Sequence, residues 1–214
     1  MSYKTTHLWI WEIAGLSVFL DGKFKEYGLD VANGKGVLLD NHRVQVNEDI
    51  YYGEKIVIAT GLIPFIPDIL GKEFIRDSTD FLEIKELPNE TIIMGAGFVS
   101  LEFASILAES GKKVDVLIRS DTALRHFYQP YVEKVMKILE NQGVNFHFNQ
   151  EAIEVIKNGD KFEVKTNNGL SLTGDYVIGA LGRVANVEGI GLENPGKLTS
   201  WAKSRRHHLQ AINT

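Results

Sequence analysis

The sequence predicts an α/β fold, in which a parallel sheet with helical crossovers is joined to an antiparallel meander and preceded by a smaller β-rich piece. Three observations support this prediction. Apolar strand-like runs alternate with helix-like runs between residues 90 and 148. Two glycines, Gly95 and Gly97, stand where the first strand meets its helix. Strand–helix–strand–helix–strand order implies parallel strands with right-handed crossovers, and the Asn158-Gly159 turn indicates a hairpin after them.

The first part of the chain reads as short strands and turns. Residues 36–40 (GVLLD), 43–46 (RVQV) and 54–61 (EKIVIATG) are β-rich runs separated by polar turns. Pro64, Pro67 and Gly71 then indicate a loop or crossover, and Pro88 marks the next boundary.

The second part supplies the alternating elements. Residues 91–94 form a strand that leads into the glycine turn, and residues 98–110 form a helix that Gly111 ends. The helix carries Leu101, Ala104, Leu107 and Ala108 on one face. Residues 113–118 are the second strand, residues 129–143 the second helix and residues 144–148 the third strand. The second helix places Val132, Val135, Met136 and Leu139 on one face, and residues 175–183 add a last apolar strand that ends in glycines.

Composition excludes several functions. The net charge of −5 argues against nucleic acid as a partner, because binding to phosphates needs a basic surface. The absence of cysteine excludes disulfides, thiolate metal sites and a redox dithiol within these residues. The apolar stretch 8–20 contains Glu12 and is too short to span a bilayer, so we expect a buried or partner-facing segment, no membrane association and a cytoplasmic protein.

The glycine turn predicts a dinucleotide-binding site. Residues 95–100, Gly-Ala-Gly-Phe-Val-Ser, match the G-x-G-x-x-G pattern except that Ser100 replaces the third glycine. The first glycine permits the turn, the second lets a pyrophosphate approach the backbone, and the third permits close packing of helix on strand, which serine nearly allows. The following helix directs its free N–H groups at the ligand. We therefore predict a Rossmann-like NAD(P)-binding domain.

The end of the second strand predicts which dinucleotide binds. A site for NADH usually has an acid there, about 20 residues beyond the glycine turn, to bind the ribose 2′-hydroxyl. This chain has Ile118, Arg119 and, six residues later, Arg125. Two guanidinium groups favour a 2′-phosphate, so the prediction is NADPH rather than NADH, unless both are only solvated loop charges.

Three patches together resemble the pyridine nucleotide-disulfide oxidoreductase family, and within it the glutathione reductase type. They are IVIATG (56–61), GAGFVSLEFA with VLIRSDTALR (95–104 and 116–125), and VIGALGRVANVEGIGLE (177–193). The resemblance implies FAD as well as NADPH, and covers roughly residues 31–194 in the family's order.

The resemblance also implies roles for individual residues. Gly95, Ala96, Gly97 and Val99 would line the pyrophosphate, and Ser120 would add a contact to those of Arg119 and Arg125. Phe98 would lie over the nicotinamide or be a core aromatic, and Glu102 would face the nicotinamide and flavin or be a surface acid. Gly182 would approach the nicotinamide, and Ala59, Thr60, Gly61 and Arg183 would form part of the flavin wall. All of these residues are read from the printed sequence.

The resemblance implies a domain order: a remnant of an FAD-binding domain with its linker (1–88), an NADPH-binding domain (89–182), and a return segment with a basic tail (183–214). Relatives of this type carry an earlier FAD glycine motif, a redox dithiol and a dimerisation domain. We therefore expect a truncated chain whose segment 8–20 is exposed and favours self-association.

The functional hypothesis is an FAD-dependent, NADPH-oxidising oxidoreductase of which this chain is the NADPH-binding portion. The alternatives are a non-catalytic NADPH-binding module and an inactive fragment. We assign no catalytic residue and no metal site. His126 and His147 lack a partner at ligand spacing in the sequence, and His207-His208 lies in a basic tail.

Overall fold

The computed structural model describes residues 22–24, 26–192 and 210–211, which form two compact units. One unit comprises Met1–Gly61 with Ala185–Thr214, and the other comprises Leu62–Val184. The apolar segment 8–20 and the basic tail lie outside the described residues, as does the expectation of self-association that rests on that segment.

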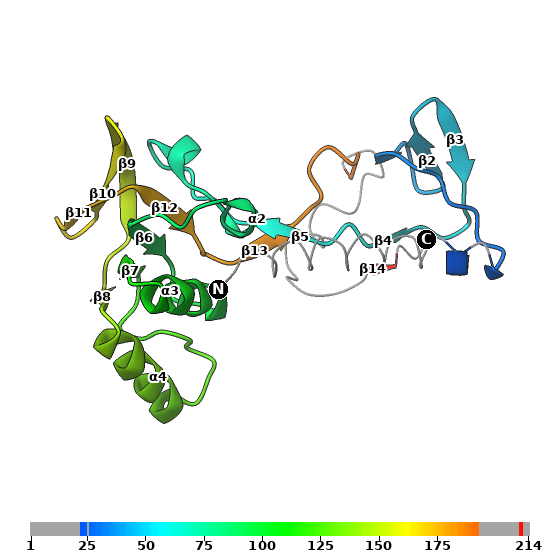
Figure 1. Cartoon of the computed structure of the whole chain (residues 1–214). Helices are drawn as coiled ribbons and strands as arrows, with labels where there is room; N and C mark the ends of the chain where they lie inside the picture. Colours follow the sequence, from blue (N-terminus) through cyan, green and yellow to red (C-terminus); the bar gives the residue numbers. More distant parts are fainter. Residues whose placement is uncertain (1–21, 25, 193–209, 212–214) are drawn as a thin grey trace. The chain divides into compact units, whose positions relative to one another are not determined.

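A four-stranded parallel sheet organises the Leu62–Val184 unit, in the order β12-β6-β7-β8 (Figure 1). The strands are β6 (Glu90–Met94), β7 (Lys113–Ile118), β8 (Val144–Phe148) and β12 (Tyr176–Gly179). Ile93 of β6 is paired with Val116 of β7 on one side and Ile178 of β12 on the other. The buried positions of β6, β7 and β12 are mostly apolar because both faces of the sheet are covered.

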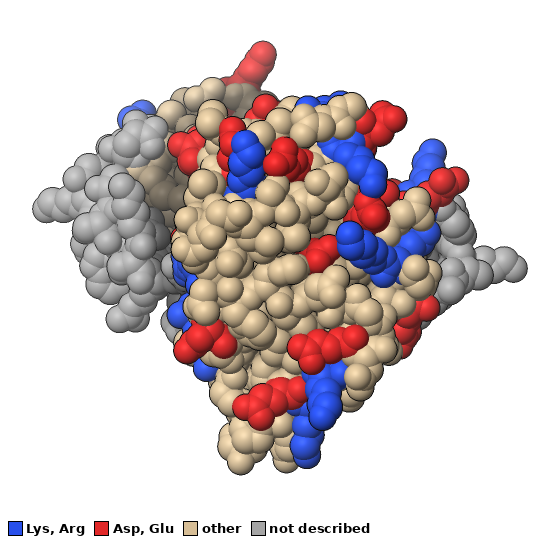
Figure 2. Space-filling view, turned by 90° about the vertical axis from the view of Figure 1, so that its left-hand side faces the viewer, with Lys and Arg blue, Asp and Glu red and all other residues tan. Residues whose placement is uncertain are grey.

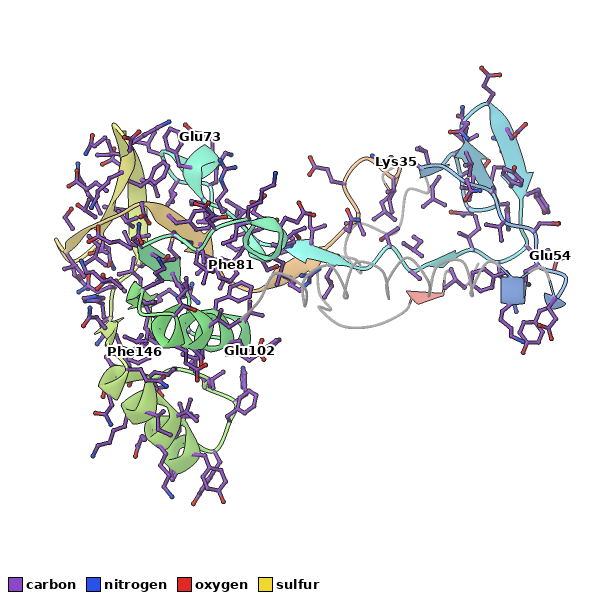
Figure 3. The ribbon with its side chains drawn as sticks, in the orientation of Figure 1. Lys35, Glu54, Glu73, Phe81, Glu102 and Phe146 are labelled. Atoms are coloured by element: carbon purple, nitrogen blue, oxygen red, sulfur yellow. The ribbon has the colours of Figure 1, made fainter. Side chains whose placement is uncertain are left out.

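Helices cover one face of this sheet. They are α2 (Ser78–Glu83), α3 (Phe98–Glu109) and α4 (Gln129–Asn141). Ile93, Val116 and Ile178 pack in one cluster with residues of all three helices, including Phe81, Leu101, Leu107, Val132 and Met136. Figure 3 labels Phe81 on α2, whose ring contacts Phe103 of α3 with centroids 4.3 Å apart. The sheet, α3 and α4 therefore share one core.

The antiparallel meander shares a second cluster with the other face of the sheet. It consists of β9 (Ala152–Asn158), β10 (Lys161–Thr166) and β11 (Ser171–Gly174), in the order β11-β10-β9. Val155 and Val164 of the meander pack with Ile92, Leu117 and Val177, which alternate along their strands with the residues of the helical face. Lys161 also donates a hydrogen bond to the Glu90 carboxylate, which lowers the pKa of that carboxyl.

The segment before β6 belongs to this unit, although the predicted boundary lies at residue 89. β5 (Leu62–Pro64) pairs with β13 (Arg183–Ala185), and η1 (Lys72–Phe74) precedes α2. The Arg76 N–H donates to Val177 O at 2.8 Å, and the Gly179 N–H donates to Arg76 O at 2.8 Å. Because Ile75 and Phe81 are also buried in the two clusters, the segment is packed against the sheet and the compact unit begins at Leu62.

The other unit contains a three-stranded antiparallel sheet in the order β1-β2-β3. Its strands are β1 (Gly36–Leu38), β2 (Arg43–Val46) and β3 (Asp49–Tyr52). A short strand, β4 (Val57–Ile58), pairs with β14 (Gln210–Ala211). Leu38, Ile190 and Leu192 form the small core, so the chain on both sides of the larger unit meets here.

One predicted apolar face is partly wrong. Val132, Met136 and Leu139 of α4 are buried as expected, but Val135 is 43% exposed. Val135 stands one residue before Met136, and a helix turns about 100° per residue, so it lies at the edge of the buried stripe.

On the face drawn in Figure 2, acidic and basic side chains are interspersed around an uncharged surface.

Candidate nucleotide-binding site

A cavity of about 450 Å³ lies at the carboxyl ends of the four parallel strands, within the Leu62–Val184 unit. Its walls come mainly from residues that follow each strand: 95–98 after β6, most of 119–127 after β7, 150–152 after β8 and 180–182 after β12. The ends of β6 and β7, Phe65 and Pro67 complete them. Ligands of open α/β sheets bind at this end. The fold thus brings together segments more than 80 residues apart.

The fold requires a glycine at position 95, independently of any ligand. Its φ is +112°, and a Cβ built there would lie 2.4 Å from the carbonyl oxygen of Ala180. The Gly95 N–H donates to Leu117 O at 2.9 Å, which fixes the turn against β7. Only glycine permits both the backbone conformation and the close approach of the segment after β12.

Gly97 is different, because nothing in the protein requires a glycine there. Its φ of −82° and ψ of 179° suit any residue, and no atom lies within 4 Å of a Cβ built at this position. Gly97 lines the cavity and is the N-cap of α3, so a side chain would occupy space in front of the helix terminus. The unpaired N–H groups of the first turn attract an anion there, which fits a pyrophosphate.

Ser100 stabilises the turn rather than facing the cavity. Its side chain is fully buried, and its hydroxyl donates to Gly95 O at 2.6 Å. Val99 packs against the helical core cluster and Ala96 lines the cavity. A serine at the third glycine position therefore preserves the packing of α3 on β6 and adds a hydrogen bond to it.

The loop after β7 carries both arginines to the cavity. Arg119 follows the last residue of β7, and its guanidinium lies 3.6 Å from the Glu151 carboxylate. Leu124 adopts a φ of +44°, and its N–H donates to Ala96 O at 3.0 Å. This hydrogen bond ties the residue before Arg125 to the glycine turn.

Polar contacts hold the same loop in shape. The Gln129 side chain donates to Leu124 O and Phe127 O and accepts from the Thr122 hydroxyl. The Ser120 hydroxyl donates to Thr122 O at 2.8 Å, so its oxygen keeps only acceptor capacity for a further contact. Arg119 and Arg125 are both exposed at the cavity.

Two residues assigned alternative roles are both exposed. Phe98 is 61% exposed and lines the cavity, so it is not a core aromatic. Glu102, labelled in Figure 3, lies on α3 with an exposed side chain and does not line the cavity.

The remaining predicted residues follow β12 and β4. Gly182 lines the cavity with a φ of +103°, and its carbonyl accepts from the Phe65 N–H at 2.9 Å. Arg183 is exposed and donates to Leu62 O at 2.5 Å. Ala59, Thr60 and Gly61 are exposed in the other unit, where Asn186 bonds to Thr60 O and Gly61 O.

Several cavity residues were not predicted from the sequence. They are Phe65, Pro67, His126, Phe127, Gln150, Glu151 and Leu181. The sequence shows no partner for His147 at ligand spacing, but in the structure its Nε2 lies 2.8 Å from the Asp115 carboxylate on the neighbouring strand. Within residues 22–24, 26–192 and 210–211, no group of three or more potential metal ligands occurs, and no helix is long and apolar enough to cross a membrane.

The chain is similar in sequence and in fold to several known reductases. Glutathione reductase from Pisum sativum (chloroplastic/mitochondrial) is 32% identical over 86% of this chain, and glutathione reductase from Nostoc sp. is 30% identical over 86%. The HOCl-induced flavoprotein disulfide reductase RclA from Escherichia coli superimposes with a TM-score of 0.72 at 30% identity, covering 78% of this chain.

The chain spans 34% and 41% of the lengths of the two glutathione reductases, and 39% of the RclA chain. The predicted α/β architecture, a parallel sheet with an antiparallel meander, is confirmed by this likeness. Residues 14–203 match the sequence model of a family described as pyridine nucleotide-disulphide oxidoreductase. The chain therefore belongs to the pyridine nucleotide-disulphide oxidoreductase family.

Proposed function

We propose that this chain is the NADPH-binding portion of an FAD-dependent oxidoreductase of the disulfide reductase type. The observation that carries the proposal is the open space in front of Gly97, at the N-terminus of α3, with two arginines on a loop bonded to the same glycine turn. The pyrophosphate would lie against the first turn of α3, and a 2′-phosphate between Arg119 and Arg125.

The chain's own residues would bind and orient the nucleotide. Gly182 and Phe98 line the same cavity as the glycine turn and would lie near the nicotinamide. FAD, when bound, supplies the hydride acceptor. Exposed Arg183, which belongs to the Leu62–Val184 unit, would contribute to the wall of the FAD site. Reduction of a disulfide needs thiols, and none of the 214 residues is cysteine, so this step would require residues from elsewhere.

A non-catalytic NADPH-binding module is the second candidate. It is favoured by the position of the cavity, whose lining residues all fall between Leu62 and Val184. The absorption spectrum of the purified chain separates the two candidates. Bound flavin supports the oxidoreductase, whereas NADPH binding without flavin supports the module. If NADPH neither binds nor raises the melting temperature, the chain is an inactive fragment, because a ligand that binds only the native state must stabilise it.

The test of the nucleotide site is calorimetric titration with NADPH and, in parallel, NADH. We expect tighter binding of NADPH, and a loss of about 10- to 100-fold in NADPH affinity when Arg119 and Arg125 are both changed to Ala, with little change for NADH. Charge-assisted bonds contribute about 1.5–3 kcal/mol each, and solvent exposure reduces this amount.

The matched control removes two cations away from the cavity. Lys134 and Lys137 are exposed on α4 and do not line it. Changing both to Ala gives the same net charge as the arginine variant. We expect it to leave NADPH affinity within about twofold of wild type, because neither side chain lines the cavity and salt screens exposed charges. Equal losses in both variants would contradict a 2′-phosphate site.

A further inference from the structure

One acidic side chain lies inside the cavity, beside the cations that would bind a 2′-phosphate. Glu151 lines the cavity, and its Oε1 is 3.6 Å from Arg119 Nη1. The two side chains are 52% and 68% exposed, so both are accessible to a ligand. Arg119 thus already has a counter-charge when the cavity holds no nucleotide.

Backbone hydrogen bonds join the two segments that carry this ion pair. On either side of Arg119, Ile118 O accepts from the Gln150 N–H at 2.9 Å and Ser120 O accepts from the Asn149 N–H at 3.1 Å. These bonds hold the segment after β8 against the end of β7. Glu151 therefore projects from a hydrogen-bonded part of the fold.

A second set of bonds fixes Glu151 from the meander. Its N–H donates to the Asn167 side-chain oxygen at 3.0 Å, and its carbonyl accepts from the Asn167 N–H at 2.9 Å. Asn167 lies in the turn between β10 and β11. The backbone of Glu151 is accordingly held beside the cavity from both sides.

A carboxylate at this position would have opposite effects on the binding of NADPH and of NADH. A 2′-phosphate would compete with Glu151 for the Arg119 guanidinium and would be repelled by its negative charge. A ribose 2′-hydroxyl would instead find an acceptor, as in sites where an acid at the end of the preceding strand selects NADH.

We propose that Glu151 is a specificity-determining residue that narrows the preference of this site for NADPH over NADH. The inference rests on the proposed function. It adds that the ion pair between Arg119 and Glu151 sets the ratio of the affinities for NADPH and NADH. The sequence places the acid 32 residues after Arg119, beyond the third strand of the sheet, where no local motif indicates it.

The test is calorimetric titration of wild type, E151Q and E154Q with NADPH and with NADH. We expect E151Q to bind NADPH about threefold more tightly and NADH about threefold more weakly, the range expected for an exposed ion pair. The ratio of the two dissociation constants then changes about tenfold in favour of NADPH.

Glu154 provides the matched control. It lies three residues further on β9, pairs with Lys165 at 3.2 Å and does not line the cavity. E154Q removes a charge of the same size, but outside the cavity. We therefore expect the ratio of its dissociation constants for NADPH and NADH to equal that of wild type. A second variant, Glu151→Ala, is expected to bind NADPH more tightly than wild type as well.

The outcomes separate this inference from the proposed function. If wild type binds NADPH but E151Q leaves the ratio unchanged, or changes it no more than E154Q does, the inference is wrong and the proposed function stands. If wild type binds neither nucleotide, the proposed function fails and the inference fails with it.

Discussion

Changing Gly97 to Val is expected to abolish nucleotide binding while the protein stays folded. The backbone at Gly97 has the extended conformation that valine prefers, and no protein atom lies within 4 Å of the new Cβ. The side chain would instead occupy the space in front of the first turn of α3. Loss of two charge-assisted hydrogen bonds to a pyrophosphate corresponds to a decrease of at least about 100-fold in affinity, for NADPH and NADH alike.

Calorimetric titration with both nucleotides would measure the loss of binding, and thermal unfolding would show whether the protein stays folded. Gly97→Ala adds a single carbon and is expected to fall between wild type and Gly97→Val in affinity. Both variants should unfold within a few degrees of wild type, because only the preference for glycine at the N-cap is lost. Retained NADPH affinity in Gly97→Val would place the pyrophosphate elsewhere.

Changing Gly95 to Ala is expected to have the opposite effect, a large loss of stability. At φ +112° an L-residue is strained, and its Cβ would lie 2.4 Å from Ala180 O, an atom of the backbone that cannot rotate away. Strain and overpacking together predict a decrease of about 2–5 kcal/mol in the free energy of unfolding. Urea denaturation followed by circular dichroism measures it.

The variant Gly111→Ala separates the backbone strain from the overpacking in this loss of stability. It also has a positive φ, +73°, but no atom lies within 4 Å of a Cβ built there. Gly111→Ala should therefore cost only the strain, about 1–2 kcal/mol. If Gly95→Ala costs no more than Gly111→Ala, the segment after β12 moves to accommodate the methyl group, and the close approach is not a constraint.

Local patterns were sufficient to predict most of the sheet. The second and third parallel strands were expected at 113–118 and 144–148, and the structure has β7 and β8 with these bounds. The first run is mostly apolar, the second alternates apolar with polar residues, and each comes shortly after a helix that ends at a glycine, which leaves little choice of position. The helix expected at 98–110 was also found, as α3 (Phe98–Glu109).

The short helix α2 was missed although a local signal for it exists. Asp77 and Asp80 form a capping box, in which each side chain accepts from the backbone N–H of the other. The helix has only six residues, and it follows two prolines and a glycine that indicate a loop. Its one buried side chain, Phe81, gives no periodicity to detect.

Contacts between distant segments could not be predicted from the sequence. Asp115 and His147 are 32 residues apart, and they meet because the register places Leu117 beside His147 and Asp115 two residues before it. Arg119 and Glu151 meet for a similar reason, since both follow adjacent parallel strands. The identity of such partners depends on strand order and register, which local composition does not determine.

The hydrogen bond from Leu124 to Ala96 holds the backbone that carries Arg125 beside the glycine turn. In the proposed site, the pyrophosphate and the 2′-phosphate of NADPH would thus be recognised within a limited range of spacings, and the site would select ligand length as well as charge. A nucleotide with its phosphates closer together reaches only one of the two subsites at a time. Inorganic phosphate or a mononucleotide would consequently compete poorly with a ligand that spans both, even at equal charge.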